Sequence, residues 1–291
     1  MGKSKEIIVK IVNAFVDNAN GGNPAGVVLG ADNLSYDEKL KVASKVGLSE
    51  TAFVSSSKVA TIKLEFFTPT KQIAHCGHAT IATFSYLQQL GKIENPNLSK
   101  ETIDGVREIL LKDNVVFMEQ KPPGYSNIDQ RKVLQSLNLS ERDLIDNLTI
   151  EIVNTGNSFA IVPIASQDIL KETKPQFDLI GQISEEYDLI GYYIFCTQTS
   201  LPERDASARM FAPRYGIEEE AGTGMAAGPL ACYLHDKVKL KKEKYFVEQG
   251  WFMKKPSPSL ITVELTIEED SITKIMAGGE GLPMSAIVVE I

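Results

Sequence analysis

The chain has few cysteines, a single tryptophan and fewer basic than acidic residues. Three scattered cysteines do not form a disulfide framework, which favours a reducing compartment, so we expect a cytoplasmic protein. The 30 basic residues against 38 acidic ones leave a formal net charge of −8. Nucleic acids and anionic membranes attract clustered basic residues, and neither is expected as a partner.

Long apolar runs are also missing. A helix that spans a bilayer needs roughly 20 apolar residues, and no stretch approaches that length. The first apolar stretch, Ile7–Val12, is short and interrupted by Lys10, so it does not resemble a signal peptide. With 43% hydrophobic and 23% charged residues, the 291-residue chain is typical of a globular protein of one large or two ordinary domains.

One layout occurs twice along the chain. Phe67–Pro69 is followed by a link and then by Cys76–Gly91, a helix of small residues with a glycine at its end. Arg209–Pro213 is likewise followed by a link and by the small-residue stretch Gly222–His235. The two copies indicate a diverged duplication and predict a site between two like halves. The predicted fold class is α+β, with two pseudo-symmetric domains, each a curved, mixed and mainly antiparallel sheet around a central helix.

The remaining elements follow from apolar alternation and from turn residues. Ser35 is expected to cap a helix over 36–46 that ends at Gly47. Further helices are expected over 127–136 and 140–146, with irregular helical segments over 166–186. Strands are expected over 6–15, 27–29, 48–54, 59–67, 106–119 (as a β-hairpin or two strands), 149–154, 158–163, 189–196, 207–211, 244–249, 259–266, 271–276 and 284–290.

Glu50 is the first candidate for chemistry. It stands at the start of an otherwise apolar strand, where partial desolvation would raise the pKa of its carboxyl group toward neutrality. Such a group can accept and return a proton. The alternative is a solvated glutamate on an edge strand.

His78 falls in the first turn of its helix, where the helix dipole favours the neutral imidazole. The backbone N–H groups of Gly77 and His78 are suited to bind a carboxylate or phosphate. The alternative for His78 is a capping or core histidine.

Cys76 precedes the same turn, where the dipole favours a thiolate. The alternative is a small buried hydrophobic residue. His75, Cys76 and His78 do not have the spacing of a zinc site, so no metal is expected.

The second copy offers the acidic run Glu218–Glu220 ahead of its helix. These carboxylates are either an acidic cap or, at Glu220, a partner acid or base for Glu50. The run Gly222, Gly224 and Ala227 loosely matches a dinucleotide-binding fingerprint, but the adjacent acidic residues would repel a pyrophosphate. No nucleophile-elbow motif of a serine hydrolase is present.

Six motifs together resemble the PhzF-like family, relatives of the phenazine-biosynthesis isomerase. They span nearly the whole chain in the family's order, and Val247–Gly250 with Lys255–Ser257 is similar to its C-terminal pattern. The six motifs are Asn23–Gly26, Ser49–Phe53, Phe67–Pro69, Cys76–Thr80, Phe211–Pro213 and Gly222–Gly224.

The resemblance implies a diaminopimelate epimerase-like fold, a homodimer and proton transfer without a cofactor. We expect an N-terminal domain of residues 1–121, completed by a C-terminal strand over 282–291, a second domain over 125–281, and an active-site cleft between them. The turn Lys121–Gly124 marks the boundary.

The resemblance also assigns site residues. Glu50 matches the catalytic glutamate and Gly77–His78 the glycine–histidine pair. Glu220 stands where the phenazine enzyme has aspartate, and Met225 where it has serine, so the phenazine precursor is not the expected substrate. The predicted catalytic residues are Glu50, His78 and Glu220, with Cys76 as an additional candidate. The predicted substrate-binding residues are Asn23, Ser49, Gly77, Gly224 and Met225.

The sequence therefore predicts a cofactor-independent isomerase that moves a proton on a small carboxylate-bearing metabolite. One alternative is a thiol-based epimerase or racemase using Cys76. Its second cysteine is replaced by Ala221, which breaks the two-thiol mechanism. Another alternative is a non-catalytic protein of the same fold that binds a metabolite or a partner.

Overall fold

Alternating apolar residues build most of the chain into β-strands, which the computed structural model describes over residues 5–291. The chain divides into two units. The first unit ends at Glu119 and is completed by Gly278–Ile291, and the second comprises Gln120–Ala277. None of the helices within residues 5–291 is long and apolar enough to cross a bilayer.

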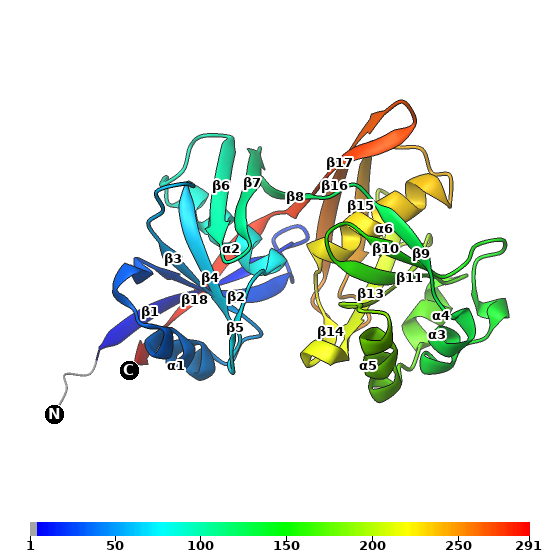
Figure 1. The fold of residues 1–291 in the computed structure, drawn as a ribbon, viewed down its shortest axis with the longest axis horizontal. Coiled ribbons are helices and arrows are strands. Elements are labelled where there is room, and N and C mark those ends of the chain that lie inside the picture. The colour runs from blue at the N-terminus through cyan, green and yellow to red at the C-terminus, as the bar shows by residue number, and fades with distance from the viewer. Residues whose placement is uncertain (1–4) are drawn as a thin grey trace. The chain divides into compact units, whose positions relative to one another are not determined.

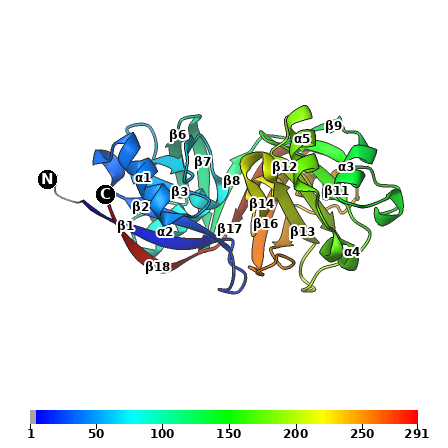
Figure 2. The same cartoon turned by 90° about the horizontal axis from the view of Figure 1, so that it is seen from below.

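From residue 5 onward, the first unit contains two α-helices, α1 (Tyr36–Val46) and α2 (Gly77–Gln89). Strand β8 continues one residue beyond the unit boundary. The strands are β1 (Glu6–Ala14), β2 (Asn23–Leu29), β3 (Thr51–Ser55), β4 (Ile62–Phe67), β5 (Gln72–Ile73), β6 (Asn97–Thr102), β7 (Gly105–Lys112), β8 (Val115–Gln120) and β18 (Gly281–Glu290). Figure 2 shows β18, in red, alongside β1, in blue, with which it pairs antiparallel.

The second unit contains four α-helices: α3 (Gln130–Ser136), α4 (Gln167–Glu172), α5 (Phe177–Glu186) and α6 (Gly224–Asp236). Strand β17 likewise runs across the unit boundary. The strands are β9 (Gly124–Asn127), β10 (Glu151–Asn154), β11 (Ser158–Pro163), β12 (Gly191–Cys196), β13 (Ala206–Ala212), β14 (Ile217–Glu220), β15 (Lys244–Gln249), β16 (Ser259–Glu268) and β17 (Ser271–Gly279).

The strand pairing of the two units is the same. In the first unit β18, β1, β2, β3, β4, β6 and β7 pair in this order, with β2–β3 and β4–β6 parallel and the other pairs antiparallel. In the second unit β9, β10, β11, β12, β13, β15 and β16 repeat the order, with β11–β12 and β13–β15 parallel. The shared pattern of mixed, mainly antiparallel sheets confirms the predicted fold class and explains the duplicated motifs.

Each unit has one central helix of small residues. Residues 77–85 of α2 are all buried, and this helix packs against β1, β2, β3 and β18 (Figure 1). The equivalent helix α6 packs against β10, β11 and β16 and is buried at 11 of its 13 positions. Small side chains allow strands to approach a helix on several sides, as the composition of the two stretches predicted.

Most predicted elements are present, and the differences are local. Ser35 and Glu38 form a capping box on α1, and Gly47 ends that helix at φ 70°, as predicted. The helix expected over 140–146 is wrong: only a 3₁₀ turn forms at Glu141–Asp143, because the chain extends again at Leu144. Strand β6 was not predicted. Its residues are mostly polar, so the sequence lacks the alternation of apolar and polar residues, although buried and more exposed positions alternate in the structure.

Candidate functional site

Glu50 is placed by the backbone on either side of it. The chain leaves α1 at Gly47 and enters β3 at Thr51, so Glu50 lies immediately before that strand. The carbonyl of Glu50 accepts a 3.1 Å hydrogen bond from the N–H of Gly26 on the parallel strand β2. A Cβ on Gly26 would lie 2.9 Å from Thr51 Oγ1, so only glycine permits this approach. The backbone of Glu50 is thereby held immediately before β3, and the residue is 7% exposed.

The start of α2 brings two further candidates to Glu50. Cys76 is the N-cap residue, and His78 lies in the first turn. The hydroxyl of Thr80 donates to the Cys76 carbonyl at 2.6 Å, which fixes the entry to the helix. Cys76 and His78 are each 5% exposed.

Glu50, His78 and Cys76 form a buried row with the imidazole at its centre. Glu50 Oε2 lies 3.2 Å from His78 Nε2, and Cys76 Sγ lies 3.7 Å from His78 Nδ1. If the thiol donates to Nδ1, the ring proton stands on Nε2, within 3.2 Å of the carboxylate oxygen but not aligned with it as a hydrogen bond. The imidazole thus lies between the carboxylate and the thiol, where it can exchange a proton with a group on either side.

The row has the character of a proton relay more than of a metal centre. The three side chains offer ligand atoms within 4.8 Å of one another. However, Glu50 and Cys76 contact different nitrogens of the same ring, whereas a metal ion would bind one nitrogen together with both partners. Burial also raises the pKa of the Cys76 thiol, which favours the protonated form.

The second unit presents Glu220 at the end of β14, half-buried. Its carboxylate accepts a short hydrogen bond from the Thr223 hydroxyl. Gln249 holds both ends of this loop: its Nε2 donates to the Glu220 carbonyl at 2.7 Å, and its Oε1 accepts from the Thr223 N–H at 3.1 Å. Tyr193 donates its hydroxyl to the same Oε1 at 2.8 Å. The loop that carries Glu220 is thus fixed from within the core.

The acidic run before α6 divides into three different roles. Glu218 is exposed to solvent. Glu219 forms a two-point ion pair with Arg209, at 2.8 and 3.0 Å, and Arg209 also donates to carbonyls at the end of α4. Glu220 accepts a hydrogen bond from Thr223, the N-cap residue of α6, so its carboxylate lies at the start of that helix.

The predicted substrate-binding residues lie at strand and helix ends. Asn23 begins β2 and is 5% exposed, while Ser49 is exposed beside Glu50. Gly77 is the first residue of α2, and Gly224 and Met225 are the first residues of α6. The candidates divide into two groups according to the unit that holds them. These groups are Asn23, Ser49, Glu50, Cys76, Gly77 and His78 in the first unit and Glu220, Gly224 and Met225 in the second.

Two residues near these groups were not predicted. Gln249 belongs to the C-terminal family pattern, but its sequence context gives no indication of a clamp on Glu220. Lys100 is part of a polar strand, where a lysine ordinarily faces water, yet it is fully buried. Only the strand register, which a single sequence does not reveal, distinguishes it from an exposed lysine.

We expect Gln249→Leu to destabilise the second unit. The change leaves the Glu220 carbonyl, the Thr223 N–H and the Tyr193 hydroxyl without this partner. Each buried polar group that loses its hydrogen-bond partner lowers the free energy of unfolding by about 1–3 kcal/mol. Urea unfolding followed by the fluorescence of Trp251, the single tryptophan, would measure the loss. The exposed Gln135 of α3 provides the matched control, and equal stability of Gln249→Leu and Gln135→Leu would contradict the clamp.

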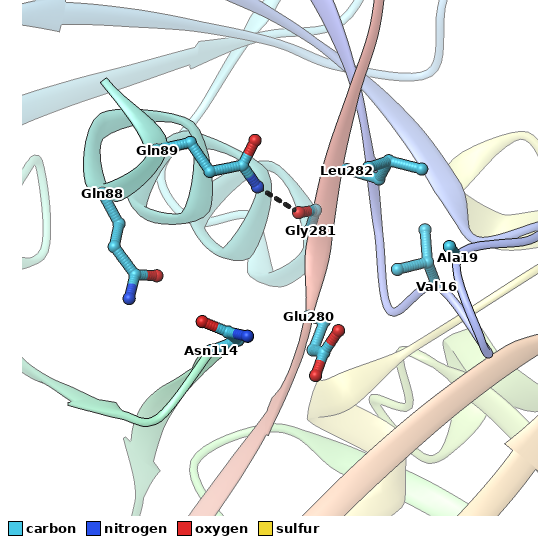
Figure 3. A pocket seen from close by; sticks show the side chains of 8 residues that line it. All are labelled: Val16, Ala19, Gln88, Gln89, Asn114, Glu280, Gly281 and Leu282. Carbon is cyan, nitrogen blue, oxygen red and sulfur yellow. Dashed lines mark hydrogen bonds between the residues drawn. The ribbon is translucent and has the colours of Figure 1, made fainter. Parts of the chain in front are cut away.

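A cavity of about 380 Å³ lies elsewhere in the first unit, at the C-terminal end of α2 (Figure 3). Gln89 donates across its wall to the carbonyl of Gly281 at 2.9 Å. None of the predicted site residues lines it, and α2 separates it from His78 by about 16 Å at 1.5 Å per residue. The lining residues are Val16, Ala19, Gln88, Gln89, Asn114, Glu280, Gly281 and Leu282.

The duplicated architecture is that of the diaminopimelate epimerase-like α+β isomerases, and the buried acid–base row suits that class. The chain belongs to the PhzC–PhzF family, described as phenazine biosynthesis-like protein, whose model matches residues 12–286. This confirms the family resemblance deduced from the six motifs.

Similar proteins agree with this assignment. A protein of Clostridium acetobutylicum named as an uncharacterized isomerase is 32% identical over 93% of this chain and 94% of its own length. The trans-2,3-dihydro-3-hydroxyanthranilate isomerase of Pseudomonas chlororaphis is 27% identical over 94% of this chain and 95% of its own. The crystal structure of a PhzF-family protein from Bacillus anthracis matches with a TM-score of 0.88 at 30% identity, covering 99% and 100% of the two chains. The chain is an enzyme of the isomerase class, which disfavours the non-catalytic alternative.

Proposed function

We propose that the chain isomerises a small carboxylate-bearing metabolite by moving a proton, with Glu50 as the acid and base. Glu50 removes a proton α or vinylogous to a carbonyl or an unsaturated group and returns it at another carbon. His78 and Glu220 assist by holding or relaying that proton. The relative from Pseudomonas chlororaphis is named for a substrate of this chemical class, an amino-carboxylate.

The observation that carries this proposal is the buried row of Glu50, His78 and Cys76. A carboxylate beside an imidazole can exchange a proton with substrate while the ring adjusts its own proton. Removal from water strengthens each of these electrostatic interactions. The row lies next to the start of α2, where backbone N–H groups of Gly77 and His78 are suited to bind the substrate carboxylate.

The start of α6 offers an equivalent carboxylate-binding position. Gly224 has no side chain to keep a ligand away from the backbone, and Gln120 anchors its carbonyl at 2.9 Å. Met225 is a half-buried thioether at the position where the resemblance to the phenazine enzyme implies a serine hydroxyl. We therefore propose a substrate with an apolar group at this position.

The thiol-based alternative has less support. Burial raises the pKa of Cys76, whereas a racemase needs a thiolate as its base. Cys196 and Cys232 are also buried, and burial raises the pKa of each of these thiols. Ala221 stands at the position of the second thiol. We therefore assign Cys76 to the end of the relay.

Deuterium wash-in tests the proposed function. The protein is incubated in heavy water with a pool of small carboxylates, and mass spectrometry identifies the compound that gains deuterium. We expect one compound to gain deuterium with the wild-type chain and not with Glu50→Gln. A gain that is equal in Glu50→Gln and is abolished in Cys76→Ser would instead support the thiol mechanism.

A further inference from the structure

Lys100 is a fully buried amine that the proposed reaction does not use. It lies on β6 with 0% exposure, and its Nζ donates to Thr80 Oγ1 at 2.7 Å and lies 3.4 Å from His75 Nδ1. No carboxylate among residues 5–291 forms an ion pair with it. The other buried lysine, Lys39, does pair with a carboxylate, that of Glu65. A buried amine without a counter-ion costs folding free energy, so its presence requires an explanation.

The second unit shows that the fold does not need this amine. Lys100 and Val247 occupy equivalent positions, since each pairs with the first residue of the neighbouring parallel strand, β4 or β13. Thr80 and Ala227 are likewise equivalent, each being the fourth residue of the central helix. The second unit builds the same place from valine and alanine, and both are buried. The polar pair is therefore particular to the unit that holds Glu50 and His78.

Lys100 is connected to the start of α2 by two routes. In the first, Lys100 donates to the Thr80 hydroxyl, which donates in turn to the carbonyl of Cys76 at 2.6 Å. Hydrogen bonds in such a chain strengthen one another. In the second, Lys100 contacts His75, the residue before Cys76. The amine thus contacts His75 directly and Cys76 through Thr80, and these two residues lie just before Gly77 and His78.

We propose that Lys100 is a positioning residue of the active site, which holds the turn 75–78 so that His78 meets Glu50. The expected effect of Lys100 on activity rests on the proposed function. Its expected effect on the position of His78 does not. Lys100 does not touch the acid–base row's carboxylate or imidazole, and it acts through Thr80 and His75.

The titratable groups around Lys100 agree with this role. The groups that face it are His75 and Cys76 from the turn, Arg107 from β7 and Asp104 from the β6–β7 turn. Burial, followed by the charges of Lys100 and Arg107, lowers the pKa of His75 to about 3, so this ring is neutral at physiological pH. Its Nδ1 can then accept a hydrogen bond from Lys100, which places the ring proton on Nε2.

The variant Lys100→Met tests the proposal, because it keeps an unbranched side chain that is shorter by one atom and removes the donor. We expect its thermal midpoint to rise and its rate of deuterium incorporation to fall about 10- to 100-fold, as for a small displacement of a reacting group. Thr80→Val removes the link to Cys76 and is expected to lower the rate similarly. Thr80→Ser keeps the hydroxyl and is the matched control that restores the rate.

The imidazole NMR signals provide a readout that needs no substrate. The chain has three histidines, so their ring nitrogens can be assigned by substituting each in turn. We expect the His78 signals to shift in Lys100→Met and Thr80→Val and to stay in place in Thr80→Ser. The His235 signals, from the second unit, should not move in any of these variants.

The outcomes distinguish the two proposals. Shifted His78 signals without any deuterated compound would support the positioning role and count against the proposed function. A wild-type rate and unchanged His78 signals in Lys100→Met would overturn the positioning role. If Lys100→Met does not fold, the test uses Thr80→Val and Thr80→Ser instead. Equal His78 signals and equal rates in these two variants would overturn the positioning role.

Discussion

Glu50→Gln is expected to lower turnover by about 10²–10⁴-fold, the usual contribution of a positioned acid or base. Glutamine keeps the shape of the side chain but cannot take up a proton. The backbone hydrogen bond that places residue 50 involves its carbonyl, so the substitution leaves the local fold unchanged. Turnover is measured as deuterium incorporation into the compound found by wash-in, and folding as the thermal midpoint by circular dichroism.

An exposed glutamate of the same unit provides the control. Glu94→Gln makes the same chemical change in a residue outside the candidate site, so both turnover and midpoint should match the wild type. Full turnover in Glu50→Gln would remove Glu50 from the mechanism. A loss of turnover accompanied by a large drop in midpoint would indicate a structural role for its carboxylate instead.

The fold could largely be predicted because local signals agree with it. The capping box at Ser35 and the glycine at residue 47 define α1, and the small residues of the two repeated stretches indicate central helices. The duplicated motifs predicted two domains of similar structure, and the identical strand pairing of the two units confirms this prediction. Strand β6 was missed, and the helix predicted over 140–146 proved to be a 3₁₀ turn, because tertiary burial decides both more than local sequence does.

The candidate site could be predicted only in part. Glu50, Cys76 and His78 were identified from motifs and helix position, and the structure brings these three together. Their order, with the imidazole in the centre, depends on how α2 faces the edge of β3, which spacing along the chain does not contain. The supporting residues Lys100 and Gln249 could not be found, because their roles arise from strand register and from contacts over long sequence separations.

Lys100 should make the stability of the first unit rise with pH above neutrality. Burial lowers the pKa of Lys100 from 10.5 to about 7 in the folded chain. Below pH 7 both the folded and the unfolded states hold the proton, and the fold carries the full cost of the buried charge. Between pH 7 and 10.5 only the unfolded state holds it, so the free energy of unfolding increases by about 1.4 kcal/mol per pH unit.

Comparison of the wild type with Lys100→Met isolates this contribution. The free energy of unfolding is measured by urea unfolding followed by circular dichroism, at several pH values from about 6.5 to about 9.5. We expect Lys100→Met to be more stable than the wild type at the lowest pH, and the difference between them to shrink as the pH rises. The fluorescence of Trp251 reports the second unit and should not show this difference. The exposed Lys58→Met is the matched control, expected to follow the wild type throughout. A stability difference between Lys100→Met and wild type that does not change with pH would mean that the folded chain accommodates the Lys100 ammonium, and the cost assigned to it would be wrong.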